Sequence, residues 1–205
     1  MNSFEPERVS KERLESSEKA DAVIVQHACM AGGATLVVGM IPFTTGLDLV
    51  FSIPILYGMY TRINASLNVA FSKHKVQSVA KMVGANLLGN VAAFAIAKIV
   101  AGFGRLIPGA HFLAGAIDAT TNGVIMYVAG KVYKQLMMNL SQSGRAYSDI
   151  DLTKEMVELL GDKKTIKAYA KEGRKALKGR DFGAFKDSAL QQKSDYENDR
   201  DLQDD

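Results

Sequence analysis

The sequence predicts an all-α protein in which two Pro-turned apolar helical hairpins pack as a four-helix bundle, followed by a short helical C-terminal tail. Three observations lead to this fold. The middle of the 205-residue chain is apolar and rich in Gly and Ala, while both ends are charged. Between His27 and Arg62 the only charged side chain is Asp48. Two clusters containing Pro interrupt the apolar part, and Pro disfavours a continuing helix because it lacks an N–H donor.

The first hairpin begins with a long helix. Residues 1–20 form its charged N-terminal part, and Pro6 or Ser10 could begin it as first-turn or capping residues. From Leu14 no helix breaker appears before Pro42. Pro42 and Gly46 form the turn, and a second helix is expected from about Thr45 onward. These segments open an apolar hairpin domain over residues 20–140.

The second hairpin repeats this pattern. We expect its first helix over residues 76–103, a turn at Pro108 and Gly109, and its second helix over residues 110–140. Residues 141–144 read as a loop. In the up-down arrangement that follows, both turns lie at one end of the bundle and the connection over residues 62–81 lies at the other.

The character of the chain changes after Ser148. Residues 148–180 read as a cytoplasmic basic helical tail with a short helix over 151–160, which Gly161 ends, and a second helix over 162–178. The second helix has a thin apolar stripe and seven basic residues: Lys163, Lys164, Lys167, Lys171, Arg174, Lys175 and Lys178. Residues 181–205 are polar and finally acidic, and we expect this end to be disordered.

Helix length and charge favour a membrane over a soluble core. An apolar helix needs about 20 residues to cross a bilayer, and small residues are enriched where membrane helices approach closely. Positive residues gather at one predicted end of the bundle (Arg62, Lys73, Lys75, Lys81, Lys131 and Lys134), whereas the Pro turns hold only Arg105. This is the positive-inside pattern with both termini cytoplasmic. Full spans, re-entrant hairpins and a buried soluble bundle all remain compatible with the lengths.

Asp48, Lys98 and Asp118 are the ionisable residues of interest in the apolar part. Asp48 stands at a helix start, where free N–H groups favour a carboxylate; proton or ion binding is the alternative. Lys98 and Asp118 are each ten residues from Pro108, so an antiparallel hairpin would bring them level. They predict a structural ion pair that fixes register. Alternatively, Asp118, Thr121 and Asn122 share a helix face that could form a transport seam.

The basic helix offers a second candidate site. Lys163, Lys164, Lys167, Lys171, Arg174 and Lys175 could lie on anionic lipid, to which each cation contributes about 1 kcal/mol. The alternative is a solvated helix whose positive charges are balanced by the acidic end after Asp195. Nucleic acid is not expected as a partner, because aromatic residues are not interleaved with these charges.

Catalytic and metal sites are not indicated. The single cysteine, Cys29, lies in an apolar run and reads as a small buried hydrophobic residue. The three histidines lack ligand spacing, so we expect no metal and no cofactor. No nucleophilic triad can be built from so few histidines, and we expect no enzymatic activity.

The apolar part resembles a known family, the helical domain often fused behind Era-like GTPase domains in bacteria, which is related to YcjF-type inner-membrane proteins. The resemblance covers about residues 20–140. The motifs that carry it are Ile41-Pro42 with Asp48, Tyr57-Gly58, the Leu106–Gly109 turn, Ala114-Gly115-Ala116, and Thr121 with Gly123. Residues 44–46 look like an insertion in the first turn. The GTPase signature G-x-x-x-x-G-K-[ST] does not occur in this sequence.

The resemblance implies a membrane-associated helical module of the bacterial inner membrane. Together with the residue patterns, it predicts a non-enzymatic scaffold or adaptor that could serve a separate GTPase or another protein partner. Its small-residue faces make a homo-oligomer plausible. Two alternatives stay open: a small transporter or pore that uses the Lys98/Asp118 seam, and a cytoplasmic helical-bundle interaction protein.

Overall fold

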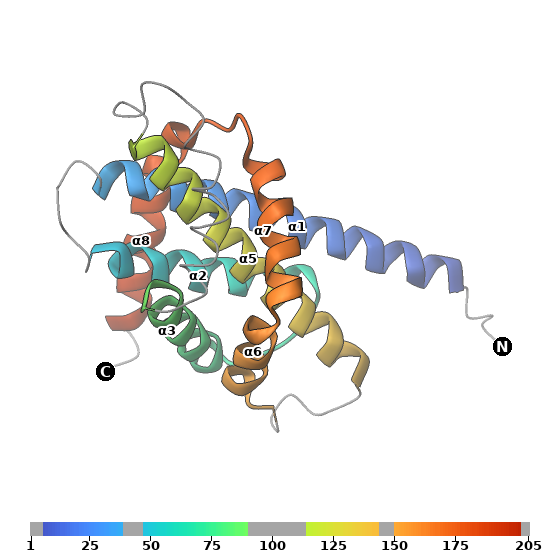
Figure 1. Cartoon of the computed structure of the whole chain (residues 1–205). Coiled ribbons are helices and arrows are strands. Elements are labelled where there is room, and N and C mark those ends of the chain that lie inside the picture. The colour runs from blue at the N-terminus through green and yellow to red at the C-terminus, as the bar shows by residue number, and fades with distance from the viewer. Residues whose placement is uncertain (1–5, 39–46, 90–113, 144–149, 202–205) are drawn as a thin grey trace.

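The computed structural model describes residues 6–38, 47–89, 114–143 and 150–201. These residues form α-helices and one short 3-10 helix, with no strand among them, so the predicted all-α class is confirmed. The helices are α1 (Pro6–Val38), α2 (Leu47–Ser66), α3 (Lys73–Gly89), α5 (Ala114–Ser143), α6 (Leu152–Gly161), α7 (Lys163–Leu177), η4 (Phe182–Phe185) and α8 (Lys186–Asp201). Figure 1 shows them gathered around α1 and α5.

Helix α1 has two different halves. Its N-terminal half, from Ser10 to Lys19, is mostly exposed and projects from the bundle (Figure 1). Its C-terminal half is the central helix, with every residue from His27 to Ala34 buried. Helices α5, α2, α8 and α7 and the short η4 all pack against it. A helix that is buried on all faces belongs either to a protein core or to a membrane, and here protein covers it.

Helix α2 runs back beside α1, as the first predicted hairpin requires (Figure 1). It continues through Pro54 and ends at Ser66. Asn68 adopts φ 53°, a left-handed conformation that Asn tolerates at helix ends. The stacked rings of Tyr60 and Tyr133, with centroids 3.9 Å apart, join α2 to α5. The Tyr133 hydroxyl donates a hydrogen bond to Asn64 of α2 over 3.1 Å.

The second predicted hairpin is not seen among the described residues. Helix α3 packs against α2 and α6, whereas α5 packs mainly against α1 and α7. In the described part of the chain, α1 and α5 form a central pair with the other helices around them, and the predicted four-helix packing stays a prediction. The turn residues Pro42, Gly46, Pro108 and Gly109 lie outside the described residues.

The C-terminal region is part of the same core. The prediction of a disordered end over residues 181–205 is wrong for residues 182–201, which form η4 and α8. Ala189 and Tyr196 of α8 are buried, and α8 packs against α2 and α1. The tail over residues 148–180 is likewise not separate, because α7 lies along α5 and α6 contacts α5 and α3. Three buried anchors hold these segments: Met156, Ile166 and Leu177.

Several glycines of the apolar part serve close packing within this chain. A Cβ on Gly130 of α5 would lie 2.8 Å from Ile24 of α1, and one on Gly84 of α3 would lie 2.8 Å from Ile53 of α2. Gly58 of α2 receives the side chain of Gln192 from α8. Small residues let helices approach closely, and in this fold they accept neighbouring helices of the same molecule.

Candidate functional site

Helix α7 is fixed at its start by Asp162. This N-cap carboxylate accepts hydrogen bonds from the backbone N–H groups of Lys164 and Thr165 and from the Thr165 hydroxyl, the last over 2.6 Å. The Thr165 hydroxyl, followed by these two N–H groups, holds the pKa of Asp162 below its usual value. Capping of this kind satisfies N–H groups that a helix start leaves unpaired. The predicted start of the basic helix is thus confirmed.

A buried stripe sets the orientation of α7. Ile166, Ala170, Gly173 and Leu177 are buried where α7 packs on α5. Gly173 allows the closest approach, because a Cβ there would lie 2.7 Å from the Tyr127 ring of α5. The Tyr127 hydroxyl donates to Glu172 over 2.8 Å, and burial, followed by this hydrogen bond, raises the pKa of Tyr127. The helix is therefore held in one rotational setting.

That setting places all the cations of α7 on one flank. At 100° per residue, the six basic residues of α7 and its C-cap residue Lys178 lie within an arc of about 120°. We call these seven residues the basic flank: Lys163, Lys164, Lys167, Lys171, Arg174, Lys175 and Lys178. The other flank carries Tyr169, which donates a hydrogen bond to Gln135, and Glu172, which binds Lys131 of α5 at 3.0 Å.

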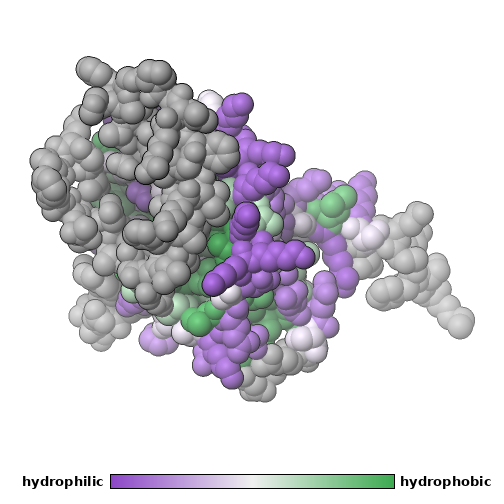
Figure 2. Space-filling view, in the orientation of Figure 1, coloured by the Kyte–Doolittle hydropathy of each residue, from purple (hydrophilic) through white to green (hydrophobic). Residues whose placement is uncertain are grey.

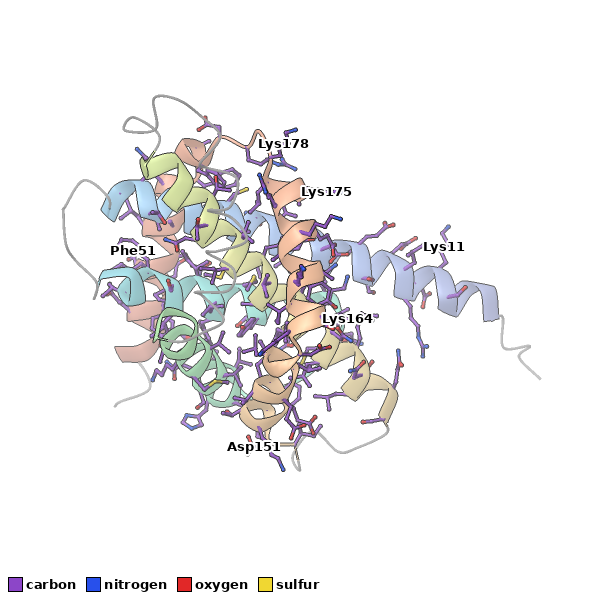
Figure 3. All side chains as sticks on the ribbon, viewed as in Figure 1. Lys11, Phe51, Asp151, Lys164, Lys175 and Lys178 are labelled. Atoms are coloured by element: carbon purple, nitrogen blue, oxygen red, sulfur yellow. The ribbon has the colours of Figure 1, made fainter. Side chains whose placement is uncertain are left out.

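The basic flank is exposed to solvent over the whole length of the helix. All of its members are exposed except Arg174, which is half-buried. Figure 3 shows Lys164, Lys175 and Lys178 spread along α7, and Figure 2 shows hydrophilic side chains over this helix with hydrophobic atoms beside them. The surface thus combines dense positive charge with nearby apolar area.

The described acids of α8 that form ion pairs have partners other than the basic flank. Asp199 of α8 pairs with Lys73 at 2.7 Å and accepts a hydrogen bond from Tyr57 at 2.9 Å. Glu197 pairs with Lys193 within α8. Within the described ranges, no ion pair joins an acid of α8 to a lysine of the basic flank. These contacts do not support the predicted alternative, in which the acidic end balances the charges of the basic helix.

A cavity of about 760 Å³ opens on the basic flank. It lies where α7, η4 and α5 meet, and Leu177 and Phe182 supply apolar lining. None of its described lining residues is acidic. They are Thr120, Lys167, Lys171, Arg174, Lys175, Leu177, Lys178, Gly179, Arg180 and Phe182.

Arg180, Phe182 and Thr120 were not predicted as site residues. Arg180 and Phe182 border or belong to the segment that the sequence predicted to be disordered. Phe182 reaches the site because it is anchored against Gly32 of α1, where a Cβ would lie 2.4 Å from the ring. Two aromatic residues close together in a charged segment, Phe182 and Phe185, were the available signal, since such residues need a partner surface.

Among the described residues, the polar candidates of the apolar part do not line this cavity, although Thr121 directly follows the lining residue Thr120 in the sequence. Asp48 lies in the first turn of α2, as its predicted role at a helix start requires. Lys98 lies outside the described residues. Asp118 lies in α5, and the predicted Lys98–Asp118 pair stays a prediction. Asn122 of α5 donates a hydrogen bond to the Thr35 hydroxyl of α1 over 2.8 Å, and Thr121 is half-buried.

Two lysines assigned to the positive end of a membrane topology have partners inside the fold. Lys134 of α5 has a side chain only 7% exposed, and its Nζ lies 2.8 Å from Asp21 of α1. Lys131 lies 3.2 Å from Asp21 and 3.0 Å from Glu172. Burial alone would lower the pKa of Lys131, but the two carboxylates outweigh it and raise the pKa. These charges are explained by pairing between helices.

One helix among the described residues is long and apolar enough to cross a membrane. The segment is Ser10–Val37 of α1, and more than half of its most apolar window is buried within the protein. Core helices of soluble proteins pass the same test, so length and composition alone do not decide between the two. The comparisons with family models, curated proteins and solved structures find no match to this chain. The resemblance to the GTPase-associated helical domain therefore stays a prediction.

Proposed function

We propose that this protein is a non-enzymatic helical scaffold that associates with the membrane surface by docking the basic flank of α7 on anionic lipid. The observation that carries the proposal is the confinement of seven cations to one exposed flank, away from the acids of α8. A cation near an anionic bilayer surface contributes about 1 kcal/mol. Several such residues on one rigid helix could approach the same surface together.

The burial of α1 favours surface association over a membrane span. The apolar half of α1 is covered by five other elements, so insertion would require removing them first. His27 is fully buried there, and its Nδ1 donates to the Val23 carbonyl over 2.8 Å. The proposal therefore keeps the bundle intact and places α7 between it and the lipid.

Flotation of the full chain with lipid vesicles tests the proposal. We expect binding to vesicles that contain phosphatidylglycerol and none to pure phosphatidylcholine vesicles. The variant Lys167→Glu/Lys171→Glu/Lys175→Glu should bind at least about 100-fold more weakly, because three favourable charges are reversed. The matched control is Lys11→Glu/Lys81→Glu/Lys154→Glu, which makes the same charge change at exposed lysines of α1, α3 and α6.

Only the position of the charges differs between the two triple variants. Equal binding by both would overturn the proposal, since net charge alone would then control association. No binding by the wild-type chain would also overturn it and would favour the second candidate, a soluble helical-bundle interaction protein. The covered α1 is the specific observation that supports that candidate. Service to a GTPase, or to another protein partner, is the adaptor part of the proposal and rests on the resemblance.

A further inference from the structure

We propose that the cavity between α7, η4 and α5 binds one amphiphile that carries a phosphate head and an apolar chain. This inference deepens the proposed function, because the cations that line the cavity belong to the basic flank. It adds a defined pocket to what would otherwise be a diffuse charged surface. Docking of the basic flank on lipid and binding in the cavity predict different behaviour with soluble ligands, so the two proposals can be tested separately.

The rim of the cavity is suited to a phosphate. Lys171 and Lys175 line it from α7, and Lys178 and Arg180 line it from the segment that follows. These lysines form no ion pair within the described ranges. Lysine binds phosphate as a point charge, and arginine can bind two oxygens at once. A phosphate at the rim would therefore meet several donors and no described acid.

The apolar part of the cavity is suited to a hydrocarbon chain. Leu177 is 2% exposed and lies close to α5, where a Cβ on Gly123 would come within 3.1 Å of it. Phe182 is packed on Gly32 of α1 and is half-buried. Both side chains are thus held in place by contacts with α5 and α1. The lysine stems add further apolar surface, because they leave only the charged ends in water.

The size and the mixture of groups together define the ligand class. A volume of about 760 Å³ falls within the range of about 300–1,000 Å³ that is usual for small-molecule sites. Inorganic phosphate would leave the apolar lining uncovered, and a neutral hydrocarbon would leave the cations without a partner. An amphiphilic phosphate monoester satisfies both parts. Such a ligand could be a free alkyl phosphate or the head and first chain segment of a phospholipid.

Calorimetry on the full chain with three matched probes tests the pocket. The probes are decyl phosphate below its micelle concentration, inorganic phosphate, and decanol. We expect decyl phosphate to bind at least about tenfold more tightly than either of the others, because it alone fills both parts. Affinity should also rise with chain length from hexyl to decyl phosphate, by up to about fourfold for each CH₂ that becomes buried.

Two double variants separate the pocket from the rest of the basic flank. Lys178→Ala/Arg180→Ala removes rim cations, whereas Lys163→Ala/Lys164→Ala removes two cations that do not line the cavity. We expect the first to weaken decyl phosphate binding about tenfold or more and the second to leave it unchanged. All four positions are exposed, so both variants should fold. Equal weakening of decyl phosphate binding in both variants would overturn the proposal of a pocket.

The apolar half of the site has its own test. Phe182→Ala should reduce the gain from each added CH₂ while leaving inorganic phosphate binding unchanged. Inorganic phosphate binding as tightly as decyl phosphate would overturn the proposal, and so would no binding of decyl phosphate. If decyl phosphate does not bind, but the Lys167→Glu/Lys171→Glu/Lys175→Glu variant still fails to bind phosphatidylglycerol vesicles, only the proposal of a pocket is wrong. Where decyl phosphate binds, vesicles that contain phosphatidic acid distinguish the two sources of the ligand: competition with decyl phosphate indicates a lipid, and no competition indicates a free alkyl phosphate.

Discussion

Phe182 of η4 lies against Gly32 of α1, so close that a Cβ on this glycine would come within 2.4 Å of the ring. The contact joins two residues that are far apart in the chain. It ties the segment after the basic helix to the centre of the fold, and it places the Phe182 ring at the cavity beside α7. The position of the candidate site therefore depends on a glycine in the central helix.

Substitution of this glycine should loosen the site. Gly32→Ala would bring the new Cβ within 2.9 Å of the Ala119 carbonyl as well as against Phe182. We expect a loss of about 1–3 kcal/mol in the free energy of unfolding, which is typical of overpacking. Urea denaturation measures it. The control is Gly161→Ala, where nothing lies within 4 Å. A loss of equal size at Gly161 would contradict the account.

Asp21 should matter more than its exposure suggests. Its carboxylate contacts Lys134 at 2.8 Å and Lys131 at 3.2 Å, and the Lys134 side chain is only 7% exposed. Asp21→Asn would leave this lysine with its Ser17 carbonyl contact but without an anion. We expect a loss of about 2 kcal/mol, less than for a fully buried pair because Asp21 itself is 41% exposed.

The control for Asp21 lies on the same helix. Glu18 is exposed and forms no ion pair within the described part of the chain, so Glu18→Gln should leave stability unchanged. Thermal denaturation of the two variants side by side gives the comparison. Indistinguishable melting curves would mean that the Asp21 contacts contribute nothing to the fold.

His27 should make the protein sensitive to acid. Burial, the largest effect, lowers its pKa from 6.5 to about 4, although the bond to Val23 opposes this shift. The unfolded chain therefore takes up a proton at a higher pH than the folded chain does. The stabilising contribution of neutral His27 is complete above about pH 6.5 and falls by about 3 kcal/mol as the pH drops to about 4.

A leucine at this position tests the titration directly. No protein group binds His27 Nε2 among the described residues, so His27→Leu should keep the stability near neutral pH. It should also remove most of the decline between about pH 6.5 and 4. Chemical denaturation across this range measures both effects. An unchanged decline in the variant would show that other groups cause it.

Asn122 should act as a link between helices rather than as part of a transport seam. Its Nδ2 donates to Thr35 Oγ1 over 2.8 Å, and this hydroxyl in turn donates to the Ala31 carbonyl over 3.0 Å. A double-mutant cycle with Asn122→Ala and Thr35→Val should give a coupling energy of about 1 kcal/mol in urea denaturation. Additive losses would remove the evidence for this link.

The sequence was informative where local chemistry decides the structure. Pro6 begins α1, Gly161 ends α6, and α7 begins within one residue of the expected start, as predicted. The basic residues of α7 could be placed on one flank by counting, because helical spacing alone fixes their angles. Most of the residues of the candidate site were therefore visible before the structure.

Contacts between distant segments could not be predicted in the same way. Helix α8 is polar and looks unable to form a core, yet Ala189 and Tyr196 anchor it and Lys73 binds Asp199. Lys134 looked like a topology signal because its partner Asp21 is more than 100 residues away. Helical periodicity and composition do not report such contacts between distant segments.

Release of the bound protein from anionic vesicles tests the central claim most directly. The full chain would be bound to phosphatidylglycerol vesicles and then washed either with about 1 M salt, where the screening length is only about 3 Å, or with alkaline carbonate. Docking through the basic flank of α7 predicts that both washes release the protein as a folded, soluble species. Retention on the vesicles after both washes would contradict the account and would place the apolar half of α1 in the bilayer.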